Sequence, residues 1–151
     1  MKLLDYTIED GFLPQIKCDV LAGVVERLVA SVLEDRPDLD PHAVVREVMR
    51  REGEGSTAIG GGLVIPHGRF AGLDQVHIGV ATLDGPLDLP ADDGQPVDVV
   101  ILLLGPASDT RQMLRVLARL ARLVKREAFL AGLRQARSAT ELRQAFSQVD
   151  L

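Results

Sequence analysis

Residues 55–69 gather the residue types that phosphoryl chemistry requires. The stretch reads Gly-Ser-Thr-Ala-Ile-Gly-Gly-Gly-Leu-Val-Ile-Pro-His-Gly-Arg, so two hydroxyls and a run of glycines precede a short apolar segment and one histidine. The apolar residues 63–65 predict a buried strand that ends at Pro66, because proline has no N–H to donate to a sheet. His67 then stands between Pro66 and Gly68, in a predicted turn where glycine permits an unusual φ and the ring is exposed on a rigid edge.

The chemistry that these residues favour is transfer of a phosphoryl group to an imidazole nitrogen. Neutral imidazole is nucleophilic near neutral pH because its unperturbed pKa is about 6.5. We interpret His67 as the nucleophile, with the hydroxyls of Ser56 and Thr57 either holding its second nitrogen or bonding phosphoryl oxygens. We expect Arg51 or Arg69 to neutralise the phosphoryl dianion, preferably through paired N–H bonds.

The glycines of the motif are candidates for binding phosphoryl oxygens through their amides. Successive N–H groups can form a concave anion site, and we expect this of Gly60, Gly61, Gly62 and Gly68. The spacing matches neither a P-loop, which needs Gly-Lys-Ser/Thr, nor a dinucleotide-binding loop. Residue types alone also allow a plainer alternative, in which the histidine, hydroxyls and glycines belong to an ordinary flexible loop.

The whole segment resembles the active-site signature of enzyme IIA domains of the bacterial phosphotransferase system, in the fructose–mannitol and nitrogen-regulatory branch. That signature combines an Arg-Glu pair, Gly-Ser-Thr, a glycine-rich stretch and an apolar-Pro-His turn, found here at 51–52, 55–57, 60–62 and 65–67. The resemblance covers roughly residues 20–147. It implies that His67 accepts phosphate from the phosphohistidine of HPr or its nitrogen-branch paralogue, with the Arg of the Arg-Glu pair nearby.

The sequence departs from the family pattern in two places. Sugar-specific members usually carry a second histidine near the start of the long helix after the last strand, and Met113 occupies that place here. A thioether is a weak acceptor and a poor partner for an imidazolium or a phosphoryl oxygen, so Arg111 or Gln112 would have to substitute. The glycine-rich segment 57–62 is also altered, with Ala58 where the family has glycine.

Three functions follow from the resemblance. The first is a stand-alone, nitrogen-regulatory-type protein that signals its phosphorylation state by binding regulated target proteins. The second is a sugar-specific subunit that passes phosphate to an enzyme IIB domain, and the third is a binding module that kept the fold and lost the chemistry. The chain length and the missing second histidine favour the first, with an HPr-type carrier as donor.

The other histidines carry less weight. His77 lies in the predicted strand 76–83, either as an outward or core residue or, if this strand neighbours that of His67, as a second imidazole at the site. His42 is expected to be solvated in the first turn of a helix. Three scattered histidines with no cysteine partners predict no metal site, and no cofactor is expected.

A basic stripe stands out in the C-terminal third. Four arginines share one face of a predicted helix, at positions Arg115, Arg119, Arg122 and Arg126. The stripe is either a solvated face or a docking face for an acidic partner.

Composition narrows the remaining classes. The 151 residues predict one domain, 1–151, with an aliphatic core, because 46% are hydrophobic but only 3% are aromatic. The net charge of −5 and the scarcity of aromatic residues disfavour nucleic-acid binding. No signal-peptide pattern is visible, and the apolar run 99–104 is too short to insert in a membrane. A cytoplasmic protein is therefore expected.

The elements around the motif predict a three-layer α/β/α domain with a mixed, mainly parallel plus antiparallel, central sheet flanked by helices. Hydrophobic periodicity and capping residues predict helices at 20–33, 41–51, 109–124 and 127–135, with a last helix capped at Ser138. Strands are predicted at 63–65, 76–83 and 97–104, with short strands at 12–16 and 87–89. Turns are expected at 84–90 and 91–96, where Gly, Pro and Asp cluster.

Overall fold

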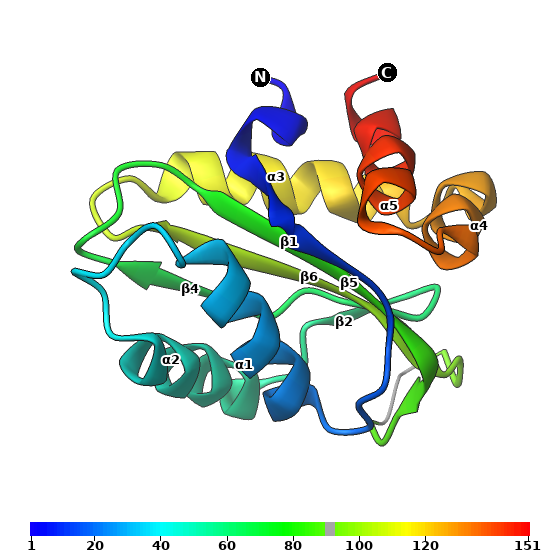
Figure 1. Ribbon diagram of the computed structural model, residues 1–151, viewed down its shortest axis with the longest axis horizontal. Coiled ribbons are helices and arrows are strands. Elements are labelled where there is room, and N and C mark those ends of the chain that lie inside the picture. Colours follow the sequence, from blue (N-terminus) through cyan, green and yellow to red (C-terminus); the bar gives the residue numbers. More distant parts are fainter. Residues whose placement is uncertain (90–92) are drawn as a thin grey trace.

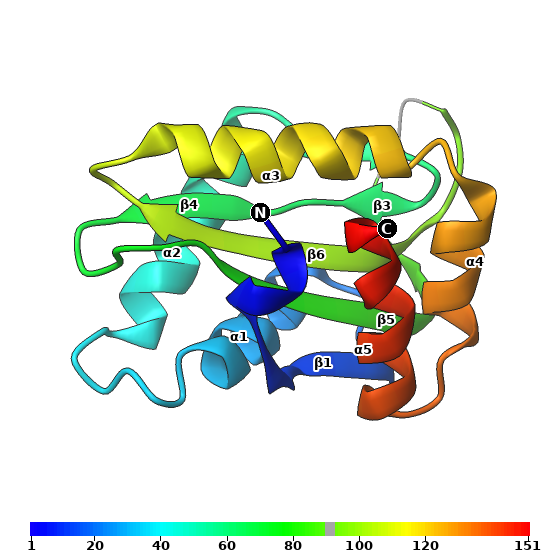
Figure 2. The same ribbon diagram turned by 90° about the horizontal axis from the view of Figure 1, so that it is seen from above.

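The computed structural model describes residues 1–89 and 93–151, and these form a mixed sheet between two layers of helices (Figures 1 and 2). The strand order is β1-β5-β6-β3-β2, and β4 also pairs with β6. The pairs β1–β5, β3–β6 and β4–β6 are parallel, and β5–β6 and β2–β3 are antiparallel. The predicted three-layer α/β/α class is confirmed. The strands are β1 (Thr7–Ile16), β2 (Ala58–Gly60), β3 (Leu63–Val64), β4 (His67–Phe70), β5 (His77–Leu87) and β6 (Val97–Pro106).

The helices divide between the two faces of the sheet. One face is covered by α1 (Leu21–Val32) and α2 (Pro41–Glu54), and the other by α3 (Thr110–Leu123), α4 (Glu127–Gln135) and α5 (Ala139–Phe146). Each layer has its own apolar core. Short 3-10 turns, Leu3–Tyr6 and Ser147–Asp150, lie beside the second layer.

The strand β6 lies between the two cores and is buried along nearly its whole length. Ile101 and Leu103 face the α3 layer, whereas Val100, Leu102 and Leu104 face the α1 layer. This explains its unbroken apolar sequence, since a strand covered on both faces cannot alternate with polar residues.

Helix boundaries follow the predicted caps. Asp40 accepts a hydrogen bond from the amide of His42, with Pro41 as the first helical residue, and Asp109 caps α3 in the same way. Ser138 accepts from the amide of Glu141, and the carboxylate of Glu141 accepts from the amide of Arg137. These local bonds satisfy amides that the helix itself leaves unpaired.

Two strand predictions are wrong in extent. The short strand expected at 12–16 is the end of β1, whose irregular register and positive φ at Gln15 hide the alternation expected of a strand. The turn and separate short strand expected from 84 to 89 are not formed. Instead β5 continues through a register shift to Leu87, which pairs with Val97. The other expected turn, 91–96, lies partly outside the described residues.

Candidate active site

His67 is the first residue of β4 rather than part of a turn. After Pro66 the chain returns to the sheet beside β6, with His67 in register with Leu103. Gly68 is likewise a strand residue and has no positive φ. Glycine at position 68 is explained by the limited space for a side chain, because a Cβ there would lie 3.0 Å from the ring of Phe70. The predicted turn at 66–68 is therefore wrong, although the half-buried His67 ring does reach the edge of the domain.

A backbone carbonyl orients the His67 ring. Its Nδ1 lies 2.8 Å from the carbonyl oxygen of Ile65. A carbonyl can only accept, so Nδ1 must carry the hydrogen, and in the neutral ring Nε2 then holds the free lone pair. The expectation that a hydroxyl of Ser56 or Thr57 holds the second ring nitrogen is wrong, because the Ile65 carbonyl bonds Nδ1. The Ser56 hydroxyl accepts from the amide of Ala58, and the Thr57 hydroxyl donates to Glu52.

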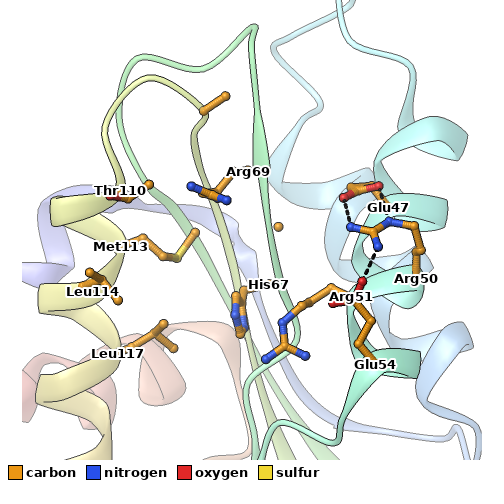
Figure 3. Close-up of a pocket in the computed structure, with 12 residues that line it drawn as sticks. Glu47, Arg50, Arg51, Glu54, His67, Arg69, Thr110, Met113, Leu114 and Leu117 are labelled. Carbon is orange, nitrogen blue, oxygen red and sulfur yellow. Dashed lines mark hydrogen bonds and ion pairs between the residues drawn. The ribbon is translucent and has the colours of Figure 1, made fainter.

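The ring lies in a pocket of about 560 Å³ between α2 and α3, with β4 as its floor (Figure 3). Arg51 extends from α2 toward the ring, and Arg69 lies two residues further along β4. A smaller hollow of about 280 Å³ also contains His67 and Arg51, and there Ser56 and Thr57 contribute to the wall. The main pocket is lined by Glu47, Arg50, Arg51, Glu54, His67, Gly68, Arg69, Ala107, Thr110, Met113, Leu114 and Leu117.

The charges of this pocket are unevenly compensated. Arg50 lies 2.8 Å from Glu47 and 2.5 Å from Glu54, and these carboxylates raise its pKa. Among the described residues, neither Arg51 nor Arg69 has a carboxylate within ion-pair distance. Within residues 1–89 and 93–151, the one hydrogen bond that Arg51 donates goes to the carbonyl of Gly55, at 3.0 Å. Two guanidinium groups are thus available to an incoming anion.

Met113 faces His67 from α3, buried in the wall of the same pocket (Figure 3). The proposed substitutes for a second histidine are engaged elsewhere. Gln112 accepts from the amide of Val76 and donates to Tyr6, and the exposed Arg111 pairs with Asp109. Neither lines the pocket.

His77 lies on the opposite face of the sheet. It is paired with Leu104, which belongs to the α1–α2 core, and β6 separates its strand from β4. Burial, followed by the positive charge of Arg36, lowers its pKa. The alternative that it is a second imidazole at the site is therefore wrong.

The glycines 60–62 serve the β2–β3 turn. All three have positive φ, which glycine adopts far more readily than residues with a Cβ. Several of their polar groups are already bonded: the amide of Gly61 donates to Asp93 and its carbonyl accepts from Arg134, while the carbonyl of Gly62 accepts from the amides of Asp98 and Val99. They line neither hollow that contains His67. Of the four glycines expected to bind phosphate, only Gly68 lines the pocket.

Sequence reasoning missed the residues that complete the walls. These follow helical spacing on the two facing helices, with Glu47, Arg50 and Glu54 on α2 and Thr110, Leu114 and Leu117 on α3. The signal was present, because residues three and four apart share one helix face.

No cluster of metal-ligating side chains occurs among the described residues. In the same part of the chain, no helix has the length and apolarity needed to cross a membrane.

The layered fold with a histidine at the sheet edge defines a known class. Residues 14–149 match the family described as phosphoenolpyruvate-dependent sugar phosphotransferase system, EIIA 2, and the chain belongs to this family. Within it, the chain is similar to the nitrogen regulatory protein of Bradyrhizobium diazoefficiens, with 35% identity over 139 residues, covering 92% of this chain and 90% of that one. The nitrogen regulatory protein of Escherichia coli is 32% identical over 124 residues, covering 82% and 76%.

Solved structures agree with this placement. The nitrogen regulatory protein IIA-Ntr from Neisseria meningitidis superimposes with a TM-score of 0.85 at 28% identity, over 95% of this chain and 97% of that chain. IIA mannitol from Escherichia coli gives a TM-score of 0.72 at 14% identity, over 91% and 95%, and shares the fold.

Proposed function

We propose that this protein is a phosphoryl carrier that accepts a phosphoryl group on Nε2 of His67 from the phosphohistidine of an HPr-type protein. The observation that carries the proposal is the hydrogen bond from Nδ1 to the carbonyl of Ile65. It leaves the lone pair on Nε2, and the ring borders a pocket that also contains two arginines without carboxylate partners among the described residues. Membership of the EIIA 2 family supports the same role.

The transfer is a displacement at phosphorus. The Nε2 lone pair of His67 forms the new P–N bond as the P–N bond of the donor phosphohistidine breaks, and the donor imidazole keeps the electron pair. The Nδ1 proton of His67 stays on the ring, shared with the Ile65 carbonyl. Arg51 and Arg69 stabilise the charge on the equatorial oxygens, which is most of what a protein contributes to phosphoryl transfer.

The regulatory role follows from charge. A phosphoryl group adds up to about two negative charges at neutral pH. Placed at the domain edge between α2 and α3, it reverses the local charge and changes which proteins bind. Similarity to nitrogen regulatory proteins supports regulated targets as the partners, in preference to an enzyme IIB domain.

The proposal is tested by phosphotransfer in vitro. The protein is incubated with phosphoenolpyruvate, enzyme I and HPr from either the general or the nitrogen branch, and the product is read by intact mass. We expect one phosphoryl group that is lost in acid, present in His42→Ala and absent in His67→Ala. His42→Ala is the matched control because this residue is exposed in the first turn of α2.

Each outcome distinguishes the candidates. Labelling that persists in His67→Ala would overturn the assignment of the acceptor, and no labelling by either donor would favour the non-phosphorylated binding module. Onward transfer to a purified IIB domain, dependent on sugar, would favour the transport role.

A further inference from the structure

Glu52 connects the last turn of α2 to the β2–β3 hairpin. Its carboxylate accepts two hydrogen bonds from Thr57, one from the amide at 2.8 Å and one from the hydroxyl at 2.5 Å. The two bonds engage both carboxylate oxygens and leave Thr57, which is buried, little freedom of backbone or side chain. Within the described part of the chain Glu52 forms no ion pair, unlike Glu47 and Glu54, so its partner is the hairpin rather than a cation.

Thr57 passes this constraint to Ile65. The carbonyl of Thr57 accepts from the amide of Ile65 at 3.2 Å, beside the β2–β3 pair Ala58–Val64. The carbonyl of Ile65 then accepts from Nδ1 of His67. Two residues, Thr57 and Ile65, therefore lie in series between the Glu52 carboxylate and the imidazole ring.

The peptide between Ile65 and Pro66 needs outside support. Proline has no N–H, so this peptide unit has no donor of its own with which to anchor its plane. Its direction is fixed on one side by the bond from the Ile65 amide to Thr57 and on the other by the carbonyl of Pro66, which accepts from Leu103 at 3.1 Å. Loss of the Thr57 contact would free one of these two supports.

We propose that Glu52 and Thr57 are positioning residues that keep the Ile65 carbonyl aimed at Nδ1 and so keep the Nε2 lone pair of His67 free. The importance of that tautomer for transfer rests on the proposed function, whereas the hydrogen-bonded series itself does not. A ring that lost the Ile65 acceptor would populate the Nε2–H form, in which the nitrogen facing the donor has no lone pair.

The test measures the ring directly. Protein labelled with ¹⁵N histidine is compared by NMR for wild type, Glu52→Gln, Thr57→Val and Thr57→Ser, with the His67 signals assigned by their loss in His67→Ala. We expect a single Nδ1–H tautomer in wild type and Thr57→Ser, and a mixture in Glu52→Gln and Thr57→Val. The phosphotransfer rate should fall about tenfold in the latter two, as when the groups that orient a functional histidine are removed.

Asp150→Asn is the matched control. Asp150 also accepts two backbone amides, those of Leu3 at 2.7 Å and Leu4 at 3.0 Å, but it lies outside both hollows that contain His67. We expect this variant to unfold at lower denaturant concentration while its His67 signals and transfer rate match wild type. Loss of stability alone is thereby separated from loss of positioning.

The outcomes separate this inference from the function on which it rests. Wild-type ring signals and rate in both Glu52→Gln and Thr57→Val would overturn it, as would a Thr57→Ser variant that resembles Thr57→Val. If the tautomer changes as expected but wild type accepts no phosphoryl group, the positioning role stands and the phosphoryl-carrier function fails.

Discussion

The imidazole of His67 is held by the main chain, and this choice of partner has a chemical consequence. A carboxylate or a second imidazole in the same place would itself titrate, and its hold on Nδ1 would change with pH. A peptide carbonyl does not titrate and can only accept, so it specifies the same tautomer throughout the range in which the protein is folded. In the neutral ring the lone pair of Nε2, the proposed nucleophile, therefore stays free.

Arg51 should be the side chain on which transfer depends most after His67. It points toward the ring and has no carboxylate partner among the described residues, whereas Arg46 lies exposed on the same helix outside both hollows. We expect Arg51→Ala to slow phosphotransfer roughly tenfold or more, because one donor to the transferring group is lost. The measurement is the single-turnover rate with a phosphorylated HPr-type donor.

Arg46→Ala serves as the matched control and should transfer at the wild-type rate. Arg51→Lys should recover only part of the loss, since an ammonium keeps the charge but not the paired N–H geometry. Equal rates for Arg51→Ala and Arg46→Ala would contradict a role for Arg51 in the transfer.

At the scale of elements, the β2–β3 turn joins β2 to β3, the short strand that precedes Pro66 and His67. Gly62 is buried with a φ of +83°, and a Cβ there would lie 2.8 Å from the carbonyl oxygen of Pro96 and against Arg134. We expect Gly62→Ala to lower the free energy of unfolding by roughly 2–4 kcal/mol, from backbone strain and overpacking together. Chemical denaturation followed by circular dichroism measures the change.

The matched control is Gly85→Ala, in β5. No atom lies within 4 Å of a Cβ at Gly85, and its φ is not positive. Its stability should stay close to wild type. A Gly62→Ala protein as stable as Gly85→Ala would show that the turn tolerates a side chain and that its glycines have another role.

Local signals explain which elements the sequence predicted. Caps such as Asp40 and Ser138 act on amides two or three residues away, so the sequence alone shows them. Long-range pairing decides the rest. The irregular strand β1 is extended because it pairs with β5, a partner about seventy residues away in sequence, and propensity cannot supply that contact.

The same distinction applies to the site. His67, Arg51 and Arg69 were predicted from residue type and the motif, and the structure brings them to one pocket. The partner of Thr57 was missed because Glu52 reaches it only when the chain folds back from α2 into the hairpin. The residue type showed that Thr57 has a hydroxyl to donate, but not which acceptor it would bond.

At the scale of the whole molecule, the pocket draws on both helical layers. α2 belongs to the layer on one face of the sheet and α3 to the layer on the other, and they approach each other at β4 (Figure 2). A phosphoryl group on His67 would therefore lie at the rim of both cores and inside neither. This arrangement lets the charge of the surface change while the apolar interior stays packed.

The other half-buried histidine provides a test of the fold as a whole. His77 faces the α1–α2 layer, where burial and the charge of Arg36 lower its pKa from the usual 6.5, while Asp74 opposes the shift. Because the folded state then binds fewer protons than the unfolded state, this histidine makes unfolding easier as the pH falls. Its contribution to stability is fully present above the unfolded pKa and is lost as the pH falls from there through the lower folded pKa.

We therefore expect urea denaturation to show wild type losing more stability than His77→Gln between about pH 7.5 and pH 5.5. The difference between the two proteins is the relevant quantity, because carboxylates elsewhere titrate equally in both. His42→Gln is the control for replacing a histidine at an exposed position. Parallel curves for wild type and His77→Gln would mean that the His77 ring gains protons as readily in the folded protein as in the unfolded chain. That outcome would contradict its burial against the α1–α2 layer.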